Sequence, residues 1–221
     1  MGGRDVRGAA KRRVRRKAER PGELLDAAFA EFSQKGYAGA TLDGIAARAG
    51  VTKGTIYLYF DGKEHLFISM VREFTKPVRD EALGLFDSFE GPTMALLQRQ
   101  LGLIYRTMAA DRRAREILRM LVAEGGRFPE LADRYYDEIL APALEALRRA
   151  LRRGIARGEI RDAGIAEHPQ LVFAPVVLLD LWMLLFAGRH PVDVESYFRA
   201  HLDLLFDGLS TEDGRKRTHT S

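Results

Sequence analysis

Apolar residues recur along this chain at intervals of three and four positions, the spacing that gathers them on one face of an α-helix. The first such stripe begins after Pro21, ends near Gly36 and consists of Leu24, Leu25, Ala28, Phe29 and Phe32. Further stripes predict helices over residues 42–49, 53–60, 63–85, 93–109, 112–124, 129–157, 166–187 and 194–207. Glycine, proline and aspartate separate them at Gly91–Pro92, Asp111, Gly125–Gly126, Gly158 and Gly188. Neither strand-like alternation nor an internal repeat is present, so the pattern predicts an all-α fold.

Residues 41–63 contain the start and stop signals of two short helices joined by a tight turn. Thr41 is a favourable N-cap, and Gly50 is the residue best able to adopt the left-handed conformation that ends a helix. Thr52 is placed to cap the second helix, while Asp61 and Glu64 resemble a capping box for the next one. Two helices connected by a glycine-containing turn predict a helix-turn-helix, whose second helix reads the DNA major groove.

The spacing of these residues is similar to that of the N-terminal domain of the TetR family of transcriptional regulators. The resemblance covers residues 24–67 and rests on Leu24, Leu25, Ala28, Phe32, Gly36, Thr41, Ile45, Ala46, Ala49, Gly50, Val51, Gly54, Thr55, Tyr57, Tyr59, Phe60, Lys63 and Leu66. It implies a helix-turn-helix domain of three helices over residues 21–67 and a C-terminal helical bundle over residues 68–221 for dimerisation and ligand binding. The implied function is that of a homodimeric repressor that a small-molecule effector releases from double-stranded operator DNA.

The resemblance also assigns the DNA contacts. It places Lys53, Gly54, Thr55, Tyr57 and Tyr59 at the major groove, and Thr41, Thr52 and Lys63 at backbone phosphates. Lys53 can donate to guanine, but the chain contains no Asn, so the bidentate Asn contact to adenine is not available. The chain departs from the family at Asp61–Gly62, where relatives often carry proline or serine, and the aspartate would repel phosphate near Lys63.

Each assigned residue also has a structural interpretation. Tyr57 could belong partly to the core, with only its hydroxyl group exposed. Thr41 and Thr52 could act as helix caps alone, and Lys63 could be a solvated residue at a helix start. The sequence leaves these alternatives open.

The charge of the chain is concentrated at its N-terminus. Residues 1–20 hold nine Lys or Arg and two Asp or Glu, a net charge of +7 compared with +4 for the whole chain. Basic blocks of this kind are commonly disordered and often contact nucleic acid, so we expect a flexible arm over residues 1–20. The side chains expected at phosphates are those of Arg12, Arg13, Arg15, Arg16 and Lys17. A solubility tail is the alternative.

Residues 171–186 are apolar apart from Asp180. The run contains Pro175 as well as that aspartate, and it is shorter than the roughly 20 apolar residues of a membrane span. A helix that is apolar nearly all round is either central or shared between subunits. Following the resemblance, we expect the helices over 166–187 and 194–207 to pair across a two-fold axis; a core helix of a monomer is the alternative.

The C-terminal helices are expected to enclose a pocket for a hydrophobic or amphipathic effector, an expectation that again rests on the resemblance. Its candidate lining residues are Leu97, Gln98, Leu101, Tyr105, Met108, Leu118, Val122, Glu124, Tyr136, Phe173, Val177, Asp180 and Trp182. Any one of the apolar residues could instead be plain core. An acidic residue inside an apolar run needs a partner, either a buried arginine or a cationic ligand.

Other classes of function lack their motifs. The chain has no cysteine, its five histidines show no metal-ligand spacing, and no nucleophile elbow or nucleotide-binding glycine loop is present. We therefore expect no enzyme, metal or cofactor. The basic N-terminus precedes no apolar signal core, which favours a cytoplasmic protein that does not associate with membranes. The alternatives are a membrane-associated helical adaptor and a DNA-binding regulator without a small-molecule effector.

Overall fold

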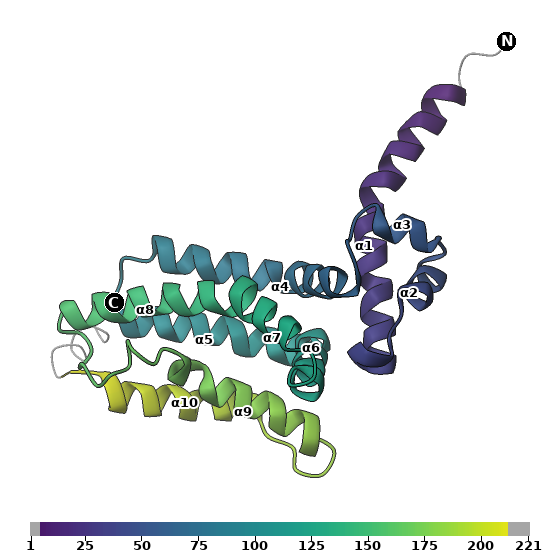
Figure 1. Cartoon of the computed structure of the whole chain (residues 1–221). Coiled ribbons are helices and arrows are strands. Elements are labelled where there is room, and N and C mark those ends of the chain that lie inside the picture. The colour runs from purple at the N-terminus through teal and green to yellow at the C-terminus, as the bar shows by residue number, and fades with distance from the viewer. Residues whose placement is uncertain (1–4, 212–221) are drawn as a thin grey trace. The chain divides into compact units, whose positions relative to one another are not determined.

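The computed structural model describes the backbone of residues 5–211 and the side chains of residues 21–211, apart from those of Asp87, Ala109 and Ala110. The described residues form α-helices and one π-helix, with no strand beyond an isolated antiparallel bridge between Ile160 and Ser210. The helices, labelled in Figure 1, are α1 (Asp5–Gly39), α2 (Leu42–Ala49), α3 (Lys53–Tyr57), α4 (Lys63–Ser88), α5 (Thr93–Ala110), α6 (Arg112–Glu124), α7 (Pro129–Tyr135), η1 (Tyr136–Leu140), α8 (Ala141–Ala156), α9 (Gln170–Phe186) and α10 (Val194–Leu209). The all-α prediction is confirmed.

The chain divides into two compact units. The N-terminal unit contains the described residues up to Glu73 together with Met120–Leu131, and the C-terminal unit contains Phe74–Arg119 and the residues from Ala132 onward. Three helices, α4, α6 and α7, therefore contribute residues to both units.

The core of the N-terminal unit is built around an aromatic cluster. The ring of Phe32 lies 5.7 Å from that of Tyr37 and 5.2 Å from that of Phe67, with edge-to-face geometry in the second pair. Phe128 adds a further edge-to-face contact to Tyr37 at 5.0 Å. Phe32 and Tyr37 lie on α1, and α2 packs against this helix. Ile45 of α2 is completely buried. These contacts hold α1 and α2 as a scaffold for α3.

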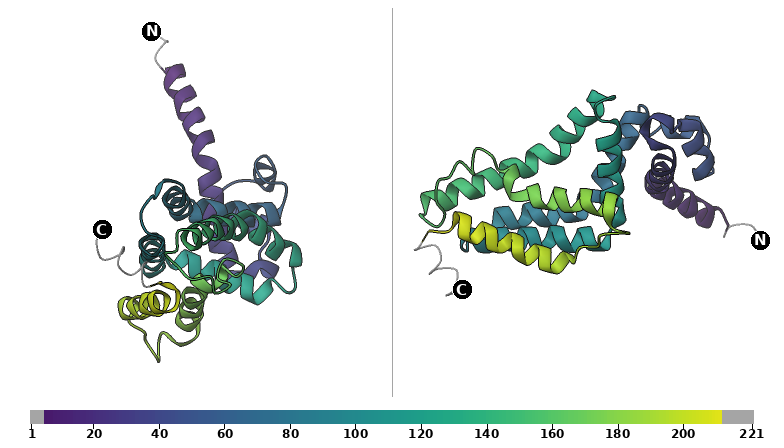
Figure 2. Two further views of the ribbon diagram at one scale, coloured as in Figure 1. Left: turned by 90° about the vertical axis from the view of Figure 1, so that its left-hand side faces the viewer. Right: turned by 90° about the horizontal axis from the view of Figure 1, so that it is seen from below.

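In the C-terminal unit, whose helices Figure 2 shows from two further sides, α5 packs against α8, α9 and α10. Their facing side chains form one apolar core that includes Leu101 of α5, Leu147 of α8, Val172 of α9 and Leu202 of α10. The apolar stripes predicted from the sequence are the helix faces that pack together in this core. The helices α5, α6 and α10 accordingly end within about three residues of their predicted ends.

The first helix is longer than predicted. It begins at Asp5 instead of Pro21, so the segment expected to be a flexible arm is helical from Asp5 onward. Its residues are mainly Ala, Arg, Lys and Glu, which are strong helix formers, and Pro21 is accommodated inside the helix. The predicted end near Gly36 is confirmed by a left-handed φ of 70° at that residue, after which one more helical turn follows.

Two further boundaries differ from the prediction because of prolines. The predicted helix over 129–157 is divided into α7, η1 and α8, since Pro142 has no N–H to offer and the Ala141 N–H bonds to Tyr136 five residues back. The predicted start at residue 166 is wrong as well. The helix begins at Gln170, directly after Pro169, because a proline disfavours helical geometry in the residue that precedes it.

Candidate functional site

The helix-turn-helix of the N-terminal unit has the predicted caps. The hydroxyl of Thr41 accepts a 3.0 Å hydrogen bond from the Gly44 N–H at the start of α2. Gly50 ends that helix with a left-handed φ of 65°, and α3 begins three residues later at Lys53. The turn thus has the length and glycine expected from the sequence.

A buried carboxylate fixes this arrangement. Glu31 of α1 is 1% exposed, and it accepts hydrogen bonds of 2.6 Å from Lys35 Nζ and from Arg48 Nε at the end of α2. The bonds from Lys35 and then Arg48 lower the pKa of Glu31, although its burial acts in the opposite direction. A side chain at Gly44 would collide with the Glu31 carboxylate, so glycine at that position lets α2 lie close to α1.

The outer face of α3 presents polar groups while its inner face is anchored. Ile56 is fully buried, whereas Lys53, Gly54 and Tyr57 are exposed. The exposed position of Tyr57 excludes the interpretation as a core residue, since 53% of its surface is accessible. Tyr59 and Thr55 are half-buried.

Two of the predicted DNA-contacting groups have partners within the chain. Lys53 Nζ lies 2.9 Å from Asp43 Oδ2, and this bond raises the pKa of Lys53. Both groups are solvent-exposed, so the pair is weak and easily exchanged for another anion. Thr52 occupies the N-cap position of α3 but makes no side-chain cap bond; its hydroxyl instead lies 3.1 Å from that of Thr55.

Lys63 has a structural role that the sequence interpretation missed. Its ammonium donates to the carbonyl oxygens of Tyr37 at 2.8 Å and Ala40 at 3.2 Å, at the end of α1, and lies 4.6 Å from the centre of the Tyr37 ring. Burial lowers the pKa of Lys63. The ammonium is thus engaged on backbone carbonyls, where the helix dipole favours a cation, and a phosphate contact would compete with these bonds. The structure therefore shows Lys63 at the C-terminal end of α1, and its contact with phosphate stays a prediction.

The capping box predicted from Asp61 and Glu64 differs in the structure, because the backbone N–H of Asp61 bonds to His65. The N–H of Asp61 donates to Nδ1 of His65 at 3.2 Å, and the two side chains lie 3.3 Å apart. The arm residues Arg12, Arg13, Arg15, Arg16 and Lys17 lie on the helical backbone of α1, but their side chains are outside the described residues.

The C-terminal unit contains a cavity of about 320 Å³, within the range of small-molecule sites. Helices α4, α5, α6 and α9, the end of α7, η1 and the start of α8 surround it. Its lining consists of Phe74, Thr75, Val78, Arg79, Ala82, Leu83, Phe86, Ile104, Thr107, Met108, Asp111, Arg113, Ala114, Ile117, Tyr135, Ile139, Leu140, Ala143, Leu144, Phe173, Val176, Val177 and Asp180. Most of these side chains are apolar, as in ligand pockets generally.

Four of the predicted lining residues reach this cavity: Met108, Phe173, Val177 and Asp180. The others do not line it. Leu97, Leu101 and Tyr105 are buried in the helical core, and the Tyr105 hydroxyl lies 3.0 Å from His201 Nδ1. Gln98, Leu118, Val122 and Tyr136 are exposed or half-buried away from the lining, and Glu124 accepts from the Ala38 N–H at 3.2 Å.

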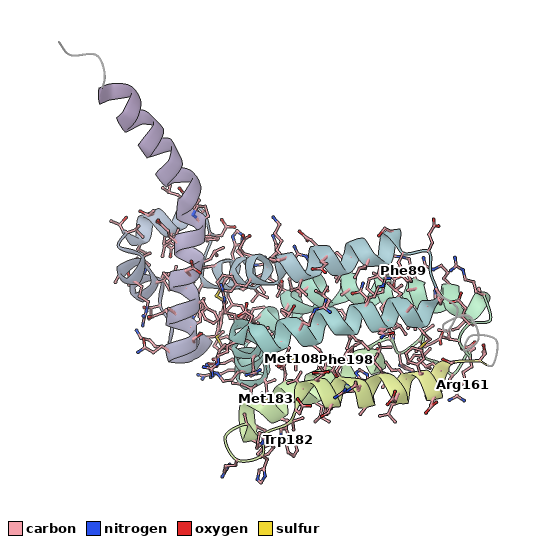
Figure 3. The ribbon with its side chains drawn as sticks, turned by 180° about the vertical axis from the view of Figure 1, so that it is seen from behind. Phe89, Met108, Arg161, Trp182, Met183 and Phe198 are labelled. Carbon is pink, nitrogen blue, oxygen red and sulfur yellow. The ribbon has the colours of Figure 1, made fainter. Side chains whose placement is uncertain are left out.

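Trp182 was also predicted to line the cavity, and it does not. Its indole N–H donates to the His190 carbonyl at 2.8 Å, beside the loop that follows α9 (Figure 3). The residues that the sequence interpretation missed are mainly those of α4 and the turn around η1, such as Tyr135 and Ile139. Pro142 was the available signal, because a proline interrupts the regular helical bonding that a continuous helix over 129–157 would require.

The acidic residue within the apolar run has a buried arginine as its partner. Asp180 Oδ1 lies 3.5 Å from Arg115 Nε, and the two side chains are 14% and 18% exposed. Burial raises the pKa of Asp180, while Arg115 partly offsets this effect. Among the described residues, no helix is long and apolar enough to cross a membrane.

Comparisons with known proteins cover both units. Residues 24–70 match the family model described as "Bacterial regulatory proteins, tetR family", and residues 94–205 match "Tetracyclin repressor-like, C-terminal domain". The HTH-type transcriptional repressor SCO4008 of Streptomyces coelicolor is 33% identical over 165 residues, 70% of this chain and 73% of that protein. Two solved structures share the fold. The regulator FadR of Bacillus subtilis in complex with stearoyl-CoA has a TM-score of 0.66 and 24% identity, covering 84% of this chain and 97% of that one. SmeT, the repressor of the Stenotrophomonas maltophilia multidrug efflux pump SmeDEF, has a TM-score of 0.69 and 21% identity, covering 87% and 91%.

Proposed function

Because this chain belongs to the TetR family of bacterial regulatory proteins, a family of DNA-binding transcriptional regulators, we propose that it is a homodimeric repressor released from its operator by a small-molecule effector. The observation that carries the proposal is the exposed polar face of α3. The helices that support it, α1 and α2, are joined by the bond between Glu31 and Arg48. The assignment gives the chain no catalytic role, since its relatives are regulators of transcription. A protein acting on bacterial DNA works in the cytoplasm.

The DNA contacts proposed for α3 are made by the residues of this helix that are exposed to solvent. Lys53, Gly54 and Tyr57 lie on its accessible side, and Gly54 permits close approach because it has no side chain. We propose that Lys53 exchanges Asp43 for a guanine edge or a phosphate on binding. Thr41, Thr52 and Thr55 contribute N–H or hydroxyl donors near the helix starts, and Tyr59 contributes its hydroxyl.

The proposed dimer surface lies on α9. Leu171, Leu178 and Leu185 recur every seven residues on this helix, and their surfaces are 56%, 56% and 64% exposed. A heptad spacing of leucines is the pattern of a helix that packs against another helix. Leu204 of α10, 73% exposed, adds a further apolar side chain. Pairing with a second copy would bury this surface and set the separation of two half-sites.

The cavity supports the effector part of the proposal. An effector changes DNA affinity only if it binds the DNA-competent and the released states with different affinities, and DNA then weakens effector binding by the same factor. Because α4 and α6 contribute both to the cavity lining and to the N-terminal unit, a displacement of either helix is carried along continuous backbone.

The test starts from DNA selected out of a randomised duplex pool by the full-length chain. The proposal predicts an enriched two-fold symmetric sequence, and Lys53→Gln should weaken binding to it about 5- to 150-fold if a base contact is lost. Lys76→Gln, at an exposed position on α4, is the matched control. Recovery of no preferred sequence would reject the proposal, and a preference for anionic vesicles over duplex would favour a membrane adaptor instead.

A further inference from the structure

We infer that the cavity of the C-terminal unit selects an amphiphile with a protonated amine, whose N–H groups donate to the Asp180 carboxylate while its apolar body fills the remaining space. The inference rests on the proposed function, since it names the chemical class of the effector. It depends on three features of the described residues: the position of Asp180, the incomplete bonding of its ion pair, and the aromatic character of the surrounding wall.

Asp180 is set into an apolar surface. It lines the cavity together with Phe173, Val176 and Val177, which precede it on α9. A carboxylate in such surroundings loses hydration and requires compensation from charge and hydrogen bonds. Its side chain retains 14% of its accessible surface, so it is not sealed off.

The compensation supplied by the protein is incomplete. Arg115 is not part of the cavity lining, and its Nε is 3.5 Å from Asp180 Oδ1, longer than an ordinary N–H to oxygen hydrogen bond. Within the described part of the chain, both of these buried atoms lack a hydrogen-bond partner. The second contact of Arg115, from Nη2 to the Met108 carbonyl, is 3.4 Å long. The pair is thus neutral in charge, but the carboxylate keeps unused capacity to accept hydrogen bonds.

A ligand in the cavity meets this pair from the carboxylate side. A ligand cation would sit at hydrogen-bond distance from Asp180, roughly 2.8 Å, and farther from the guanidinium that lies outside the lining. A ligand carboxylate in the same place would face like charge. The remaining charged lining groups are already engaged: Arg79 lies 3.4 Å from Asp80, and Arg113 lies 3.4 Å from Asp111 and 4.7 Å from the Phe74 ring centre.

The wall of the cavity favours a cation independently of Asp180. Phe86, Tyr135 and Phe173 contribute aromatic rings in addition to Phe74, whose ring Arg113 already contacts, and the faces of aromatic rings attract ammonium groups and repel anions. Tyr135 is close enough to Asp180 for that carboxylate to help raise the pKa of its hydroxyl, after the larger effect of burial. Tyr135 therefore stays neutral and can share the amine with Asp180 without adding negative charge.

The experiment compares three ligands that differ only in their polar end: octylamine, octan-1-ol and octanoate. Binding to the full-length chain is measured by calorimetry and by the shift of the thermal midpoint at pH 7. We expect the amine to bind at least tenfold more tightly than the alcohol, and octanoate to bind most weakly. The Asp180→Asn variant should bind amine and alcohol equally, whereas Asp133→Asn, at an exposed position on α7 outside the cavity lining, should keep the preference of the native chain.

A second variant guards against loss of folding, because Asp180→Asn leaves Arg115 without its counter-charge. Asp180→Asn combined with Arg115→Gln removes both charges and should also lose the preference for the amine. Equal binding of amine and alcohol by the native chain, or tighter binding of octanoate, would overturn the inference, as would binding of none of the three. The proposed function is judged separately: it fails if the chain selects no DNA sequence, whatever the ligand result.

Discussion

Replacing Lys63 by methionine tests whether this lysine supports the domain or contacts DNA. The ammonium donates to carbonyl oxygens at the end of α1, at 2.8 Å for Tyr37 and 3.2 Å for Ala40, and it lies over the Tyr37 ring. Methionine keeps the length of the side chain and its packing on the ring but removes every donor. The carbonyl groups then lose a charged partner, and the helix end loses its neighbouring cation.

The magnitude follows from the number and exposure of these bonds. A hydrogen bond to a charged group contributes about 1.5–3 kcal/mol, but the site is half-exposed and water can replace part of what is lost. We therefore expect a destabilisation of about 2 kcal/mol. For a chain of this size that corresponds to a fall in the thermal midpoint of about 4–8 °C. Circular dichroism melts of Lys63→Met and of the exposed control Lys76→Met measure the difference.

The salt dependence of DNA binding distinguishes a structural role of Lys63 from a contact with phosphate. A lost phosphate contact lowers the slope of log affinity against log salt by about 0.9. If Lys63 is structural, Lys63→Met should leave the slope unchanged below its melting midpoint, measured by fluorescence anisotropy with a selected duplex. An unchanged midpoint together with a reduced slope would refute the structural role and restore the phosphate contact predicted from the sequence.

Three further predictions follow from the same structure. Glu31→Gln should destabilise the chain by about 2–3 kcal/mol at pH 7; because the folded pKa of Glu31 is lowered below 4.5, its contribution is present above pH 4.5 and is lost as the pH falls through the folded pKa, so denaturant melts of native chain and variant should converge in acid. Leu178→Asp combined with Leu185→Asp should convert a dimer to a monomer in analytical ultracentrifugation, whereas the exposed control Val122→Asp should remain dimeric. Deletion of residues 1–18 should weaken binding to all duplexes and flatten the salt dependence; an unchanged slope would assign the basic segment to solubility.

The sequence alone determined the all-helical fold, most helix boundaries and the location of the helix-turn-helix. Those features depend on local rules: apolar spacing defines a helical face, and Thr41 and Gly50 act through neighbouring backbone groups. The segment around Pro142 escaped prediction because a proline after a long apolar stripe can end, bend or widen a helix. Neighbouring contacts decide among these outcomes.

Only the tertiary structure decided which side chains share a site. Lys63 reaches carbonyls some 23 to 26 residues earlier in the chain, and Arg115 reaches Asp180 from another helix. Periodicity identifies the apolar face of a helix, but it does not distinguish residues such as Tyr105, which pack in the core, from residues such as Tyr135, which border a cavity. That distinction depends on how several helices pack together, a property that no single segment of the sequence contains.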